Sequence, residues 1–160
     1  MRIVSGSCKG RRIDPPGNFR ARPTTDFAKE NLFNVLNNRF DLEAMSVLDL
    51  FSGTGSISYE FASRGAQRVV SVELDGVHQR FIRESAEKLG LRQIKSVRMN
   101  AFTYLKSAKG EQYDLIFADP PYDLPGIEAL PDLVMGSGLL KPGGWFIFEH
   151  SRQKDFSDHP

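Results

Sequence analysis

The segment Val47-Leu-Asp-Leu-Phe-Ser-Gly-Thr-Gly-Ser-Ile57 decides the fold. An apolar run is followed by Gly53 and Gly55, and apolar residues then recur at helical spacing. This is the pattern of a strand, a tight turn and a helix start, and glycine at such a turn lets the backbone approach a ligand closely. A dinucleotide fingerprint needs a third glycine where Ser58 stands, and a P-loop needs a Gly-Lys-Ser/Thr sequence that is absent, so the pattern argues against both.

Short apolar runs alternate with segments of helical spacing along the rest of the chain. Nearly continuous apolar strands are typical of a parallel sheet that is covered on both faces. We therefore predict a doubly wound, mostly parallel, Rossmann-like α/β fold with right-handed crossovers. The predicted strands are Met45–Leu50, Arg68–Glu73, Ser96–Met99, Tyr113–Ala118 and Trp145–Glu149, and the predicted helices are Phe27–Asn37, Ser56–Arg64, Val77–Leu89 and Gly126–Met135.

Length and composition indicate one globular domain. The chain has 160 residues, of which 40% are hydrophobic and 26% charged, which excludes a disordered or collagen-like protein. A single cysteine, Cys8, is typical of a reducing compartment, and no His or Cys spacing indicates a metal site. Because the chain lacks both a run of roughly 18 apolar residues and a signal peptide, we expect a cytoplasmic protein with no membrane contact.

The basic residues are concentrated near the N-terminus. Residues 1–40 contain eight Lys or Arg and three Asp or Glu, although the net charge of the whole chain is only +1. Such an uneven distribution fits either a polyanionic partner bound on one face or a solvated basic surface. We expect residues 1–25 to form a basic arm on a core of residues 26–160, in which Arg2–Ser5 and Gly10–Ile13 pair as a β-hairpin and Thr25 or Asp26 caps the first helix.

An acidic residue follows the glycine loop at a spacing that suggests a nucleoside. Glu73 ends the second predicted strand eighteen residues after Gly55, where a carboxylate accepts hydrogen bonds from both ribose hydroxyls. Asp49, at the end of the first strand, is placed to bind a positively charged group such as an ammonium. A nucleoside that carries an amino acid in place of phosphates is S-adenosylmethionine, which we therefore predict as the cofactor.

The end of the third predicted strand offers further contacts. The Asn100 side-chain carbonyl could accept a hydrogen bond from the adenine amino group, and Phe102 could lie against the ring. Asn100 is equally well placed to cap the helix that follows, so the sequence leaves both roles open.

The most specific feature is the segment Asp119-Pro-Pro-Tyr122 at the end of the fourth predicted strand. Two prolines fix an extended backbone and remove two N–H donors, which leaves the Asp119 carboxylate and the Pro120 carbonyl as acceptors. Two acceptors side by side can bind both hydrogens of an exocyclic base amine and direct its nitrogen at a methyl donor. Tyr122 would stack on the base, a contact worth roughly 1–3 kcal/mol.

These motifs together resemble a known family. The segments LDLFSGTGS (48–56), VELD (72–75), NAF (100–102) and ADPPY (118–122) are similar to class I S-adenosylmethionine-dependent methyltransferases that modify exocyclic amines. With the opening MRIVSGSCKGRRI and RARPTTDFAKENLFN (20–34), nearly the whole chain resembles the bacterial 16S rRNA guanine-N2 methyltransferases of the RsmD type. The resemblance implies methylation of N2 of one guanine in the 16S rRNA of the 30S subunit, by a monomer that needs no metal.

The same resemblance assigns roles to individual residues. The catalytic group would be Asp119, Pro120 and Tyr122, and the cofactor would be held by Asp49, Phe51, Gly53, Gly55, Glu73, Leu74, Asn100, Ala101 and Phe102. Contacts to rRNA phosphates, which make binding salt-dependent, would come from Arg2, Lys9, Arg11, Arg12, Arg20 and Arg22.

The chain departs from the family pattern at its C-terminal end, and the sequence leaves two other functions open. Members of the family continue past Trp145–Glu149 with two more strands, so we expect this strand to form an open edge in a shortened or naturally truncated chain. The first alternative is methylation of adenine N6 in DNA or RNA, because Asp119–Tyr122 binds an amine and not a whole base. The second is a cofactor-binding RNA module that assists ribosome assembly without turnover.

Overall fold

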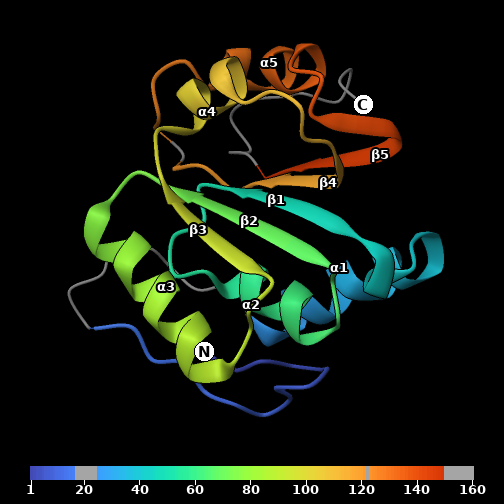
Figure 1. Cartoon of the computed structure of the whole chain (residues 1–160), viewed down its shortest axis with the longest axis vertical. Coiled ribbons are helices and arrows are strands. Elements are labelled where there is room, and N and C mark those ends of the chain that lie inside the picture. Colours follow the sequence, from blue (N-terminus) through green and yellow to red (C-terminus); the bar gives the residue numbers. More distant parts are fainter. Residues whose placement is uncertain (17–24, 122, 150–160) are drawn as a thin grey trace.

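The computed structural model describes residues 1–16, 25–121 and 123–149, which form a sheet of five parallel strands in the order β3-β2-β1-β4-β5 (Figure 1). The strands are β1 (Ser46–Leu50), β2 (Arg68–Glu73), β3 (Ile94–Arg98), β4 (Tyr113–Ala118) and β5 (Leu140–Phe148). The helices are α1 (Asp26–Arg39), α2 (Ser56–Ser63), α3 (Gly76–Leu89), α4 (Ala101–Ser107) and α5 (Leu130–Gly136), with 3-10 turns η1 (Leu42–Ala44) and η2 (Ile127–Ala129). The predicted α/β fold is confirmed.

Helices cover both faces of the sheet (Figure 1). On one face, which we call the α2 face, α1, α2 and α3 pack in a core that includes Phe33, Phe61 and Val47. On the other, the α4 face, α4 and α5 pack in a core that includes Leu130 and Leu48. Neighbouring residues of β1 thus enter different cores, as the alternation of side chains along a strand requires. No helix in the described ranges is long and apolar enough to cross a membrane.

Two strands have the predicted bounds and three do not. β1 begins one residue later than predicted, at Ser46, and β3 is Ile94–Arg98 where Ser96–Met99 was predicted, because its pairing with β2 begins at Ile94 opposite Val69. The predicted bounds of β2 and β4 are confirmed residue for residue. β5 begins at Leu140, five residues before the predicted start at Trp145. The pairing of β4 and β5 shifts register between Tyr113 and Leu115, and this irregularity accommodates the Pro-Gly-Gly segment 142–144. Within the described part of the chain, β5 lies at the edge of the sheet, as predicted.

Helix ends follow the expected capping chemistry. The Thr25 side chain accepts a hydrogen bond from Ala28 N at the start of α1, which confirms one of the two predicted caps. Gly90 ends α3 in the left-handed conformation, with φ of 71°. The predicted helix Gly126–Met135 is interrupted: it begins as η2 and becomes α-helical only from Leu130, with Pro131 in the first turn.

The N-terminal arm forms the predicted antiparallel pairing over a short stretch and also packs on the core. The two predicted hairpin strands form one isolated antiparallel bridge, between Arg2 and Arg12. The turn between them also bonds to the end of α2: Ser7 N donates to Ser63 O at 2.7 Å, and Cys8 N donates to Ser63 Oγ at 2.9 Å. The arm is therefore held by its own short antiparallel pairing, in which Ile3 N donates to Arg11 O and Ile13 N to Met1 O, both at 3.0 Å, and by the contacts of its turn with α2.

A buried ionic network anchors this arm. The Glu60 carboxylate, fully buried on α2, accepts hydrogen bonds from Val4 N at 2.9 Å and Ser5 N at 3.0 Å. It also accepts from Arg64 Nε at 2.8 Å and lies 3.5 Å from Lys29 Nζ. Buried Lys29, on α1, donates to the carbonyl of Arg2 at 2.6 Å. One carboxylate thus joins the arm, α1 and α2, and its hydrogen bonds offset the cost of its burial.

We expect Glu60→Ala to destabilise the fold by about 3–5 kcal/mol, because it leaves the Lys29 ammonium buried without its carboxylate. The arm loses two backbone hydrogen bonds at the same time, so proteolysis near residues 4–8 should become faster. Urea unfolding and limited proteolysis measure the two effects, with Glu84→Ala, an exposed change on α3, as the control. Unchanged stability of the Glu60 variant would contradict the anchoring role.

Candidate functional site

The predicted site residues gather where the strand order of the sheet reverses, at the carboxyl ends of β1 and β4. Ligands of open α/β sheets bind at this switch point. Asp49, Glu73 and Asp119 come from three adjacent strands, and their charges are close enough that Glu73 and Asp119 both raise the pKa of Asp49. The structure therefore brings together three acidic residues that are far apart in the sequence.

The glycine loop between β1 and α2 is bent by left-handed backbone conformations at three alternate residues. Phe51, Gly53 and Gly55 have φ angles of 57°, 60° and 86°. At Gly55 a Cβ would lie only 2.7 Å from the ring of Tyr59, so glycine is needed there for space as well as for conformation. The left-handed conformation of Phe51 is a costly one that the sequence pattern did not predict.

Glu73 supports this loop directly. One of its carboxylate oxygens accepts a hydrogen bond from Gly53 N at 2.8 Å, and the other accepts from Asp75 N at 3.0 Å. Each oxygen keeps a further lone pair, and the side chain is partly exposed, so the predicted bonds to ribose hydroxyls remain available. Glu73 thus holds the loop in place at the position where the ribose is expected.

Asp49 is buried between β1 and the first turn of α2. Ser58 Oγ donates to its carboxylate at 2.6 Å and also contacts Ser71 Oγ. Burial raises the pKa of Asp49 to about 7; the Ser58 hydrogen bond opposes this rise, and the neighbouring carboxylates add to it. In this conformation the Asp49 carboxyl is engaged with Ser58, and its contact with a ligand ammonium stays a prediction.

The end of β3 provides the apolar wall of the site. Asn100 caps α4: its side-chain oxygen accepts from Phe102 N at 2.8 Å and from Thr103 N at 3.2 Å, so the structure shows the capping role of the two that were open. Phe102 lies edge-on to Phe51, with ring centroids 6.1 Å apart. Leu74 is 58% exposed nearby at the end of β2, and Ala101 is buried. An aromatic ring of a ligand would find apolar neighbours here.

Asp119 follows β4 on the same edge. Its side chain is solvent-exposed, yet the surrounding protein and the charge of Glu149 raise its pKa to about 6. Pro120 is buried behind it. Tyr122 lies outside the described residues, so its predicted stacking role is not placed. Glu149, at the end of β5, is a neighbour that the sequence analysis missed; its only signal was its position at the end of the strand next to Asp119.

The basic arm runs beside the site along α2. Thr54 of the glycine loop contacts the sulfur of Met1, whereas the turn of the arm lies at Ser63, at the opposite end of the helix. The predicted RNA-contacting residues Lys9, Arg11 and Arg12 are exposed, and Arg2, half exposed, forms an ion pair with Asp26 at 2.8 Å. Arg20 and Arg22 lie outside the described residues.

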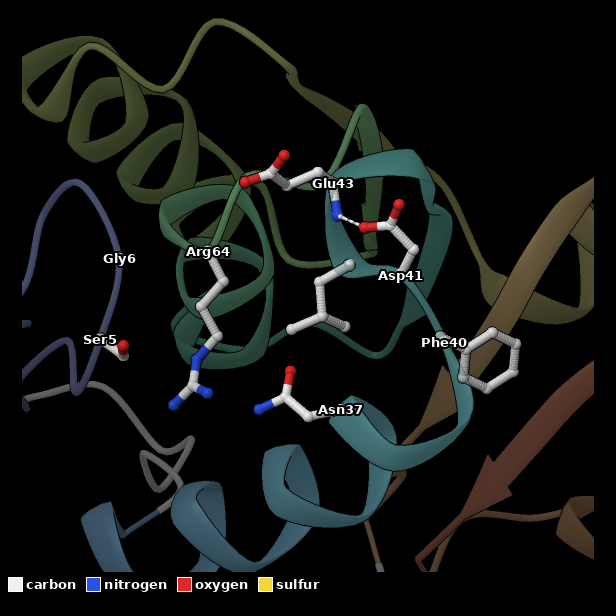
Figure 2. A pocket seen from close by; sticks show the side chains of 8 residues that line it. Ser5, Gly6, Asn37, Phe40, Asp41, Glu43 and Arg64 are labelled. Carbon is white, nitrogen blue, oxygen red and sulfur yellow. Dashed lines mark hydrogen bonds between the residues drawn. The ribbon is translucent and has the colours of Figure 1, made fainter.

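The opposite edge of the sheet carries a shallow pocket, with a cavity volume of about 360 Å³. Figure 2 shows Arg64 and Asn37 directed toward it between the arm, α1 and η1. It contains none of the residues that the sequence assigned to catalysis or to the cofactor, and Arg64 is engaged with Glu60. Among the residues that the structure describes, no cluster of three His, Cys, Asp or Glu could hold a metal.

Comparison with known proteins gives a family match over the whole chain. The model of the family described as conserved hypothetical protein 95 matches residues 1–160. Ribosomal RNA small subunit methyltransferase D from Escherichia coli (strain K12) is 33% identical over 141 residues, which cover 88% of this chain and 69% of the relative. The protein of the same name from Buchnera aphidicola subsp. Baizongia pistaciae is 30% identical, over 93% of this chain and 75% of the relative.

Solved structures share the fold. A hypothetical protein of Thermus thermophilus superposes with a TM-score of 0.86 at 30% identity, over 98% of this chain and 89% of that one. The protein SMU.776, solved in complex with SAH, superposes with a TM-score of 0.60 at 26% identity, over 71% of this chain and 34% of that one. The Thermus thermophilus structure confirms the architecture over nearly the full length of this chain.

Replacing Asp49 by Asn is expected to raise the free energy of unfolding at pH 8 and to leave it nearly unchanged at pH 4. The pKa of Asp49 is about 7 in the folded protein, against 3.8 without burial. The unfolded chain therefore ionises first, and the stability that the protonated group contributes is lost as pH rises from 4 to 7. The difference corresponds to at most about 4 kcal/mol.

Urea unfolding at both pH values measures this effect. Asp14→Asn, which removes an exposed carboxylate, is the matched control. An Asp49→Asn variant that gained no stability over the parent between pH 4 and pH 8 would show that burial of the Asp49 carboxylate does not destabilise the fold.

Proposed function

Because the chain belongs to the family described as conserved hypothetical protein 95, we propose that it is an S-adenosylmethionine-dependent methyltransferase that modifies the N2 amine of a guanine in the 16S rRNA of the small ribosomal subunit. The observation that carries the proposal is the placement of Asp119 and Pro120 beside the glycine loop and Glu73, at one switch point. The names of the relatives, rRNA small subunit methyltransferase D, support rRNA as the substrate.

The charges of the site fit the cofactor. Asp49, Glu73 and Asp119 lie close together, and none of them forms an ion pair with any residue that the structure describes. S-adenosylmethionine carries a sulfonium and an ammonium, which would relieve this repulsion. Glu73 would bind the ribose, and Phe51, Leu74 and Phe102 would contact the adenine. When bound, the cofactor supplies an electrophilic methyl group. The SAH complex of SMU.776, a protein of related fold, supports this assignment.

Asp119 and Pro120 would prepare the amine. The lone pair of an exocyclic base nitrogen is delocalised into the ring, so the nitrogen is a poor nucleophile until its hydrogens are held out of the ring plane. The Asp119 carboxylate and the Pro120 carbonyl would each accept one amine hydrogen and direct the nitrogen toward β1. Methylation of the amine would release one proton from its nitrogen, and Asp119, with a pKa of about 6, is mostly ionised at pH 7 and able to accept that proton.

The arm would supply affinity for RNA. Lys9, Arg11 and Arg12 are exposed on one surface beside α2, as phosphate contacts require. A guanine that is paired or stacked must first be extruded into the pocket, at a cost of a few kcal/mol. The substrate would be a cytoplasmic particle, and the enzyme is proposed to act on it as a monomer without metal.

Asp119→Ala should abolish methyl transfer and change cofactor affinity by no more than a few-fold, because Asp119 holds the amine and not the nucleoside. The assay incubates the protein with labelled S-adenosylmethionine and 30S particles that lack the modification, then maps the labelled nucleotide. Asp123→Ala, an exposed change four residues away, is the control and should retain activity.

Each other outcome of this assay has a distinct meaning. Incorporation by Asp119→Ala would show that the catalytic assignment is wrong. Label on an adenine would favour the N6 alternative. Binding to 30S particles without incorporation by the parent protein would favour an assembly module.

Reversing two charges of the arm, in Arg11→Glu/Arg12→Glu, should weaken 30S binding at least tenfold at moderate salt and reduce its salt dependence, because fewer counterions are released. The matched control is Lys106→Glu/Lys109→Glu, which reverses two exposed charges on or next to α4, on the other side of the sheet. Equal losses in the two double variants would mean that the arm is not the RNA-binding surface.

A further inference from the structure

Glu149 lies directly beside Asp119 in the sheet. β4 and β5 run parallel with Phe117 opposite Ile147 and Ala118 opposite Phe148, and Glu149 N extends the pairing by donating to Ala118 O at 2.9 Å. The next pair in this register is Asp119 and Glu149. Because adjacent strands are only about 4.8 Å apart, the two carboxylates are neighbours.

Both residues belong to the side of the sheet that carries the cofactor loop. Phe117 enters the core of the α2 face, and Ala118 enters that of the α4 face. The alternation of side chains returns Asp119 and Glu149 to the α2 face, which is also the face of Asp49, the register partner of Phe117. The charges agree with this placement: Asp119 acts on Asp49 on one side and is acted on by Glu149 on the other.

The strand order of the sheet then determines where the cofactor and the base would lie relative to one another. The glycine loop follows β1, the amine-holding Asp119 follows β4, and Glu149 follows β5. A base whose amine is held at β4 and directed toward the methyl donor above β1 must extend its remaining atoms away from β1, toward β5. The ring atom beside the amine therefore meets an acceptor.

The chemistry of that neighbouring ring atom differs among the bases. In guanine the N2 amine lies between N1, which carries a hydrogen, and N3, which has a lone pair, so the orientation with N1 toward β5 presents a donor to Glu149. In adenine the N6 amine, and in cytosine the N4 amine, lie beside a ring nitrogen that has a lone pair and no hydrogen. A carboxylate at this position binds the first arrangement and repels the other two.

We propose that Glu149 is the residue that selects guanine, by accepting a hydrogen bond from the ring N1–H while Asp119 and Pro120 hold the N2 amine. This inference rests on the proposed function and deepens it, since Asp119 alone recognises an amine and leaves the base undetermined. Both carboxylates are exposed and neither is in an ion pair with any described residue, so their acceptor positions are open to a base.

The test replaces the target guanine by 2-aminopurine, which keeps the 2-amino group and has a bare lone pair at N1. Once the methylated position is mapped, 30S particles are assembled from 16S rRNA that carries either base there. The parent protein should prefer guanine by at least about 100-fold in kcat/KM, because a site that is built to accept a hydrogen bond rejects an analogue that lacks the donor.

Glu149→Gln should reduce this preference to about tenfold or less. Its amide retains an acceptor for guanine N1–H and gains a donor for the bare N1 of 2-aminopurine. Activity on guanine should fall and activity on 2-aminopurine should rise, which a merely structural defect would not produce. Glu43→Gln, the same change at the opposite edge of the sheet, is the control and should keep the preference of the parent.

The two ways in which this test can fail are distinguishable. If the parent methylates guanine and Glu149→Gln keeps its full preference over 2-aminopurine, Glu149 does not select the base and the proposed function stands. If the parent transfers no methyl group to guanine in any 30S particle, the proposed function itself is wrong, and the inference falls with it.

Discussion

In a parallel sheet the carboxyl ends of all strands lie side by side along one end of the sheet, which is the edge meant here. Residues in register on neighbouring strands point to the same face. Here this constraint brings Glu73, Asp49, Asp119 and Glu149 to one edge from four adjacent strands, although these residues are spread along the chain from position 49 to position 149. The glycine loop crosses above β1, in the middle of the row. A ligand that binds at this edge therefore meets, in order, a group that suits a ribose, a loop that suits a charged chain, and two acceptors that suit a base amine and its ring neighbour.

Four carboxylates placed close together repel one another and destabilise the fold, and the structure shows which of them is affected most. The effect is greatest at Asp49, which is buried against α2, where serine hydroxyls are its hydrogen-bond donors and no cation pairs with it among the described residues; burial raises its pKa to about 7. Glu60, on the same helix, shows the contrasting solution: its buried carboxylate receives two backbone N–H groups, a guanidinium and an ammonium. The carboxylate at the structural anchor is paired with two cations, whereas Asp49, Glu73 and Asp119 form no ion pair with any described residue, a difference that fits the usual trade between stability and function.

The sequence predicted what depends on local pattern and missed what depends on contacts between distant elements. β2 and β4 are mostly apolar runs without proline or glycine, and their bounds were predicted to the residue. β5 contains Pro142 and two glycines, and only its pairing with β4 makes it a strand from Leu140. The glycine loop, Glu73 and Asp119 carry motif-scale signals and were found. Glu149 carries none, because its significance arises from the β4–β5 register, and a lone glutamate after an apolar run is otherwise ordinary.

The basic turn of the arm and the acidic strand ends lie at different places, so in the proposed complex one would provide affinity for RNA and the other would select the base. Phosphates are the same at every nucleotide, so exposed Lys9, Arg11 and Arg12 can hold RNA on the protein without identifying a base. The acidic residues of the ligand edge would weaken that attraction if the turn of the arm moved toward them. The buried contacts of Glu60 and Lys29 hold the arm along α2, with its turn at Ser63, the end of the helix far from the glycine loop. A row of carboxylates repels phosphate and attracts hydrogen-bond donors, so it would favour a base that has left the stack over the backbone that carried it. The polarity of the molecule, with a basic arm along α2 and acidic residues at the strand ends, would orient the RNA of the proposed substrate before any base is read.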